Sequence, residues 1–114
     1  MRTVTIEVSS WEQTKQRMEA AFRGEPQGEF LSFASMELLW NVLTPRRSEI
    51  LQAMAGKEPM SLRAVARLVG KDVKTTHGDV QTLLKNGLLE KDPSGKLVFP
   101  YDAIHVDFMI KAAA

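Results

Sequence analysis

Three helix starts and one hairpin turn follow each other along the middle of this 114-residue chain. Thr44 and Pro45 put a hydroxyl at a helix N-cap and a proline at the first helical position, where its missing N–H costs nothing. Ser61 and Asp72 are suitable N-caps for two further helices. The sequence Asp-Pro-Ser-Gly at 92–95 then has the residues of a type I turn between two short apolar runs. This order predicts three helices followed by a β-hairpin.

The predicted helices cover residues 45–55, 62–69 and 72–86, and the predicted hairpin strands cover 88–91 and 96–99. Between the second and third helices, Gly70 can adopt the positive φ that a tight turn requires. In the third helix, spacing favours an inward face formed by Val73, His77, Val80, Leu83 and Leu84. Asp79 and the lysines of this helix are then expected to point outward.

The flanking segments add strands and two more helices to the prediction. Apolar residues alternate with polar ones over 3–8 and again over 101–110, which is typical of half-buried strands. A helix is expected from residue 11 to about 23, a short strand near 30–35 and a helix over 36–43. The apolar stripe of the first of these helices would be Trp11, Met18, Ala21 and Phe22. The chain is therefore predicted to be α+β and mostly α.

This pattern predicts a winged helix-turn-helix domain over 44–110, with the C-terminal strand included and residues 1–43 as an N-terminal strand–helix extension. The extension has more apolar residues than its own short elements can bury, so we expect it to pack on the domain or to form a homodimer. Trp11, Phe33 and Trp40 are interpreted as core or dimer surface rather than as a platform for stacking bases.

Composition excludes several classes of protein. The chain has no Cys and only two His, so a disulfide scaffold and a thiolate metal site are excluded, and no metal or cofactor is expected. No apolar run approaches the roughly 18 residues that a membrane span needs, so no membrane partner is expected. We expect a cytoplasmic protein.

An enzyme is also not expected from these residues. The chain has neither a glycine-rich phosphate-binding loop nor a Gly-x-Ser-x-Gly motif. His77 and Asp79 are two residues apart, so on a helix their side chains would diverge and could not form a catalytic dyad.

Charge is unevenly distributed along the chain. The net charge is only +1, but residues 61–98 carry seven Lys and Arg against four Asp and Glu. A basic segment that coincides with a helix-turn-helix favours double-stranded DNA as the partner. The third helix would enter the major groove, and the hairpin lysines would lie near the minor groove. Arg46, Arg47 and Arg63 would hold the DNA backbone. The predicted DNA-binding residues are Arg46, Arg47, Arg63, Lys71, Lys74, Thr75, Thr76, Gly78, Gln81, Lys91 and Lys96.

Over about residues 30–108 the chain resembles the small prokaryotic winged helix-turn-helix predicted transcriptional regulators, which are related to the multiple-antibiotic-resistance and arsenical-resistance repressor groups. The resemblance is carried by the segments 43–47, 68–77, 79–80, 88–90 and 98–102, which read Leu-Thr-Pro-Arg-Arg, Leu-Val-Gly-Lys-Asp-Val-Lys-Thr-Thr-His, Asp-Val, Leu-Leu-Glu and Val-Phe-Pro-Tyr-Asp. It implies a dimeric repressor that binds DNA. The family often carries Arg where this chain has Gly78, so either the DNA approaches closely at this position or it is bound weakly.

Two alternative functions remain open on the sequence alone. Some proteins of this kind resemble antitoxins, which would bind a cognate toxin protein and use DNA binding only for autoregulation. A winged helix can also bind protein alone, in which case the basic residues would form no more than a solvated face.

Overall fold

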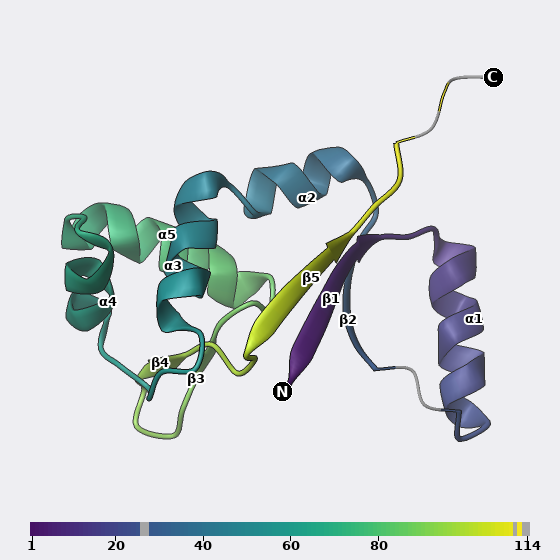
Figure 1. The fold of residues 1–114 in the computed structure, drawn as a ribbon, viewed down its shortest axis with the longest axis horizontal. Coiled ribbons are helices and arrows are strands. Elements are labelled where there is room, and N and C mark those ends of the chain that lie inside the picture. Colours follow the sequence, from purple (N-terminus) through teal and green to yellow (C-terminus); the bar gives the residue numbers. More distant parts are fainter. Residues whose placement is uncertain (26–27, 111, 113–114) are drawn as a thin grey trace.

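A three-stranded parallel sheet lies at the centre of the molecule, with helices on either side (Figure 1). The computed structural model describes residues 1–25, 28–110 and 112. The sheet has the order β2-β1-β5, formed by Thr3–Val8 (β1), Glu29–Phe33 (β2) and Ala103–Asp107 (β5). β1 therefore pairs with strands from both ends of the chain, with Ile6 opposite Leu31 on one side and Val106 on the other.

Three helices form the part of the molecule on the left of Figure 1. They are Pro45–Met54 (α3), Leu62–Val69 (α4) and Val73–Lys85 (α5). The expected caps are present, since the side chains of Thr44, Ser61 and Asp72 each accept a hydrogen bond from a backbone N–H in the first turn. Met36–Val42 (α2) runs from the sheet towards α3 and begins at a fourth cap, Ser35.

The hairpin is shorter than its sequence predicts. β3 and β4 are Glu90–Lys91 and Leu97–Val98, and Met60 forms an isolated bridge with Leu97. The turn between them forms as expected, with Gly95 at a φ of +87° and the Asp92 carboxylate accepting hydrogen bonds from the backbone N–H groups of Ser94 and Lys96. The preceding leucines, 88 and 89, are fully buried in the core instead of extending the strand.

One hydrophobic core joins the extension to the rest of the chain. Ile6 from β1 and Leu39 from α2 belong to the same buried cluster as Ile50, Val80 and Phe99. The described residues thus form an α+β fold of five helices and two small sheets, in which residues 1–43 share both the sheet and the core with the C-terminal part of the chain.

The apolar stripe predicted for the first helix is not part of the core, so for Trp11 only the dimer-surface interpretation stays open. Trp11–Phe22 (α1) contains no buried residue, and the side chains of Trp11 and Phe22 are 71% and 90% exposed. The helix is attached mainly through Arg17, which pairs with Glu7 and lies over the Phe30 ring at 4.0 Å. A polar outer face of the sheet explains this: Thr5 and Glu7 point towards that side, and they give the stripe little apolar surface to cover.

Gly70 provides the first testable consequence of this fold. It ends α4 at a φ of +68°, and a Cβ added there would meet no atom within 4 Å. Gly70→Ala should therefore lower the free energy of unfolding by about 1 kcal/mol through backbone strain alone. Urea denaturation measures this; an unchanged midpoint would show that the turn relaxes.

Candidate nucleic-acid interface

The turn between α4 and α5 sets where the basic residues lie. The Lys71 N–H donates to the Ala66 carbonyl oxygen at 3.0 Å, which closes the end of α4. Asp72 then caps α5: its carboxylate accepts from the Thr75 N–H at 2.7 Å and from the Thr75 hydroxyl at 3.0 Å. These hydrogen bonds hold the pKa of Asp72 below its ordinary value of 3.8. Lys71 and Lys74 are both exposed on either side of this cap.

The N-terminus of α5 does not present all of its backbone N–H groups to the solvent. The Asp72 carboxylate already occupies the Thr75 N–H and adds a negative charge at the positive end of the helix dipole. Positive charge at this end of α5 is therefore supplied by the exposed ammonium groups of Lys71 and Lys74, and the capping carboxylate offsets that of the helix terminus.

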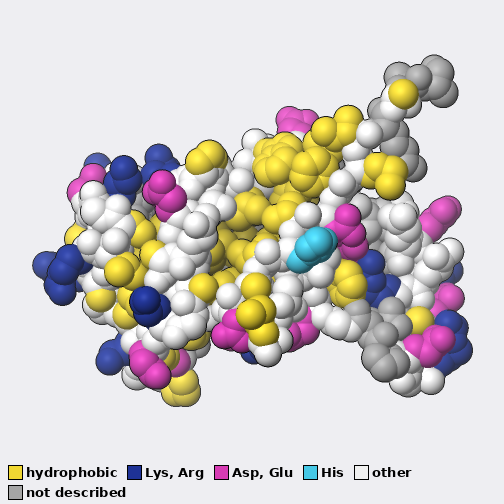
Figure 2. Space-filling view, viewed as in Figure 1, with side chains coloured by type: hydrophobic (Ala, Val, Ile, Leu, Met, Phe, Trp, Pro, Cys, Tyr) yellow, Lys and Arg dark blue, Asp and Glu magenta, His cyan; other side chains and the backbone are white. Residues whose placement is uncertain are grey.

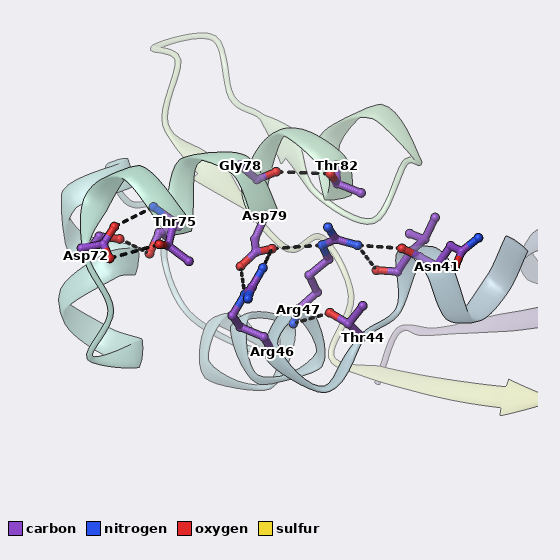
Figure 3. Close-up of polar contacts among 11 residues, drawn as sticks. Asn41, Thr44, Arg46, Arg47, Asp72, Thr75, Gly78, Asp79 and Thr82 are labelled. Atoms are coloured by element: carbon purple, nitrogen blue, oxygen red, sulfur yellow. Dashed lines mark hydrogen bonds and ion pairs between the residues drawn. The ribbon is translucent and has the colours of Figure 1, made fainter. Parts of the chain in front are cut away.

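An ion-pair cluster ties α3 to the middle of α5 (Figure 3). Asp79 is 2% exposed and lies between two arginines of α3. Arg46 donates to both of its carboxylate oxygens, at 2.5 and 2.9 Å, and Arg47 donates to one of them at 3.1 Å. The hydrogen bonds from Arg46, outweighing the opposing effect of burial, hold the pKa of Asp79 below 3.8, and Arg47 adds to this.

The two arginines differ in what else they can do. Arg47 also donates to the carbonyl oxygens of Asn41 and Val42 at the end of α2, at 2.7 and 3.2 Å, and its side chain is mostly buried. The Arg46 side chain is 51% exposed, and within the described part of the chain it donates hydrogen bonds to Asp79 alone. Arg47 is therefore structural, while Arg46 can still face a ligand.

The exposed surface of α5 borders two shallow hollows. On the side of α3, one hollow is lined by Arg46, Arg47, Asp79 and three α5 residues, Lys74, Thr75 and Gly78. On the side of the hairpin, the other is lined by residues that include His77, Gln81, Lys91 and Gly95. Thus most of the predicted site residues do come together around α5.

Two predicted DNA contacts are wrong. Thr76 is 1% exposed, and its hydroxyl donates to the Asp72 carbonyl oxygen at 2.8 Å, so it faces the protein core. Arg47 is committed to Asp79 and to the end of α2, and it is not available as a backbone clamp. Arg63 and Lys96 are exposed but line neither hollow.

The prediction of which face of α5 is buried was also partly wrong. Val73 and His77 are exposed, while Thr76, Asp79, Val80 and Leu83 form the buried face. Val80 and Leu83 lie on both the predicted and the observed face, so the difference is a rotation of the helix by less than one residue. The sequence pattern did not reveal that Thr76, Asp79 and Leu83 share one face of the helix. The Thr76 hydroxyl and the Asp79 carboxylate are polar, and they find their hydrogen-bond partners only in the folded protein.

Lys and Arg side chains gather around the end of the molecule that α4, α5 and the hairpin form, with some Asp and Glu between them (Figure 2). In the described part of the chain, no group of three His, Cys, Asp or Glu side chains is placed to hold a metal ion. Nor is any described helix both long and apolar enough to cross a membrane.

The packing of the protein does not explain why residue 78 is a glycine. It lies inside α5, and an added Cβ would meet nothing within 4 Å. Gly78→Ala should therefore raise the free energy of unfolding by about 1 kcal/mol, because glycine loses more backbone entropy in a helix. In urea denaturation this variant should shift opposite to Gly70→Ala; a destabilised Gly78→Ala would mean that the helix needs glycine.

The comparisons with known proteins add one finding. The model of one protein family, HVO_A0114, matches residues 42–106, which is more than half of the chain and extends from the last residue of α2 into β5. No curated protein and no solved structure gives a significant match.

Proposed function

The chain belongs to the HVO_A0114 family, and we propose that it is a winged helix-turn-helix transcription regulator that binds double-stranded DNA. In this proposal α4 and α5 are the helix-turn-helix and β3 and β4 are the wing. α5 enters the major groove, as the second helix of such motifs does. A regulator of this kind works in the cytoplasm, where the chromosome is.

One observation carries the proposal. Lys71, in the turn just before α5, and Lys74 and Gly78, within α5, are all exposed, and this helix has a half-exposed arginine on one side and a hairpin lysine on the other. Ammonium and guanidinium groups on both sides of a helix match the two phosphate backbones that border a major groove. At Gly78 the DNA backbone or a base edge can approach the helix without meeting a side chain.

The residues of this surface divide into two roles. Lys71, Lys74, Arg46 and Lys91 supply positive charge for phosphates, which gives affinity but no sequence preference. Thr75 and Gln81 lie on the same helix, and a Gln amide can read an adenine through two hydrogen bonds. Gln81 is therefore the residue that we expect to carry sequence preference.

Selection of genomic fragments by the purified protein tests the proposal. Bound fragments are sequenced and compared with the input, and we expect a small set of enriched sites that share one sequence. Gln81→Ala should change the preferred base at one position of that sequence while leaving fragments bound. Recovery of fragments in input proportions by the wild-type protein would contradict the proposal.

The same experiment separates the two alternatives. An antitoxin that autoregulates would enrich mainly the region upstream of its own gene, next to a gene for its toxin. A winged helix that binds only protein would enrich no fragment at all.

A further inference from the structure

β5 is an edge strand with one unpaired side. The sheet order is β2-β1-β5, and the Ala103 N–H donates to the Arg2 carbonyl oxygen beside β1. Because the N–H and C=O of one residue point to the same side of a strand and alternate along it, the backbone groups of Ile104 and Val106 point away from β1. Such an edge is a template for another strand.

Apolar side chains lie along this edge. Val106, Met109 and Ile110 are 36%, 72% and 79% exposed. Trp40 of α2, itself nearly half exposed, packs against Phe108 with ring centroids 5.3 Å apart. Figure 2 shows hydrophobic side chains gathered over this middle part of the molecule. Charged residues, which natural edge strands use to prevent pairing, are limited within β5 to Asp107, which lies with His105 on the other face of the strand.

An apolar groove of about 330 Å³ borders the same edge. It lies between α3 and β5, and its lining includes Leu43, Ala55, Phe99, Ile104 and Val106. A strand added to β5 would lie beside this groove and could fill it with its own apolar side chains.

We propose that a second copy of this chain pairs its β5 with this edge, antiparallel, about a two-fold axis at Val106. In this register His105 lies opposite the partner's Asp107, on the outer face, and the same pair repeats across the axis. Ile104 lies opposite the partner's Phe108 on the groove side. Both are favourable cross-strand combinations, one of them an imidazole with a carboxylate and the other an aliphatic with an aromatic side chain.

The polar residues of the strand select this register. Moving the axis by one residue to His105 would leave each Asp107 opposite Ala103, without an imidazole partner, and moving it to Asp107 would place two like-charged carboxylates opposite each other. Like charges directly opposite are destabilising. Only the axis at Val106 gives each His an Asp, which makes β5 complementary to itself and favours a second copy over another protein.

The filled groove is a consequence of the same register. Phe108 and Ile110 of the partner would lie on the groove side of the sheet, next to Ile104 and Asp102. The exposed residues beyond β5 thus cover the apolar groove of the other copy, and two three-stranded sheets become one sheet of six strands. This goes beyond DNA binding and does not depend on it.

Two cysteine variants test the register, since the chain has no Cys of its own. His105→Cys and Asp107→Cys are purified separately, then mixed and oxidised without DNA. Opposite residues of a non-hydrogen-bonded pair have Cα atoms about 4.5 Å apart, within disulfide range, whereas diagonal residues at about 7–8 Å are beyond it. We expect a disulfide-linked band at twice the 12.8 kDa mass of the chain in the mixture, and none in either variant alone.

The other outcomes overturn the proposal. A cross-link in His105→Cys alone would place the axis at residue 105, and one in Asp107→Cys alone would place it at 107. In sedimentation, the unmodified protein should be a dimer at micromolar concentration without DNA. A monomer at all concentrations tested, or no cross-link in the mixture, removes the interface and leaves the DNA-binding proposal untouched.

Discussion

Asp79→Asn is expected to lower the free energy of unfolding by roughly 3 kcal/mol, because it leaves Arg47 without its carboxylate in a mostly buried position. Asparagine has nearly the same shape as aspartate, so the effect measures charge rather than packing. Asp79 also connects α3 to α5, so its replacement should weaken the attachment of α5 to α3. Urea denaturation followed by circular dichroism gives the value.

A matched control is Glu90→Gln, which makes the same chemical change at an exposed position on β3. That variant should stay within about 0.5 kcal/mol of the wild type. Equal stability of Asp79→Asn and the wild type would contradict the structural role given to the cluster.

The pH dependence of stability has the same origin. The folded pKa of Asp79 is lowered, so its contribution is fully present above about pH 3.8 and is lost as the pH falls through the folded pKa. The difference in unfolding free energy between wild type and Asp79→Asn should therefore be constant near neutral pH and shrink below pH 3.8. A difference that grew on acidification would have the wrong sign for a carboxylate stabilised by arginines.

Lys74→Ala should weaken the affinity for duplex DNA by roughly tenfold, and Lys71→Ala with Lys74→Ala by more, because each removes an expected phosphate contact, Lys74 from the first turn of α5 and Lys71 from the turn just before it. Both side chains are exposed, so the fold should be unaffected. Fluorescence anisotropy with a labelled duplex selected from genomic fragments measures the loss.

Lys85→Ala is the matched control for this prediction. It removes the same charge from the same helix, but from its last turn, at the far end from Lys74. Equal losses for Lys74→Ala and Lys85→Ala would indicate that only net charge matters, and would contradict binding through the N-terminal half of α5.

Local signals in the sequence were sufficient for most elements of the fold. The capping residues and Gly70 determine where α3, α4 and α5 begin or end, and these depend on hydrogen bonds within a few residues. The turn at 92–95 was predictable for the same reason, and the strand over 3–8 was predictable from the alternation of its apolar residues.

Interactions between distant residues could not be read in this way. Nothing local to residues 3–8 indicates that β1 pairs in parallel with both β2 and β5, since such pairing is decided by the whole chain. The buried position of Asp79 depends on two arginines more than thirty residues away. A carboxylate with two partners can replace an apolar residue at a helix interface, and apolar periodicity does not detect it.

The salt dependence of DNA affinity tests the central claim most directly. For the wild-type protein and a duplex containing its selected site, the logarithm of the association constant should fall linearly with the logarithm of salt concentration, with a slope of about −0.9 for each phosphate contact. Lys74→Ala should reduce the magnitude of that slope by about 0.9, and Lys85→Ala should leave it unchanged. Binding that does not depend on salt, or an absence of binding even at low salt, would contradict a DNA-binding role for α5.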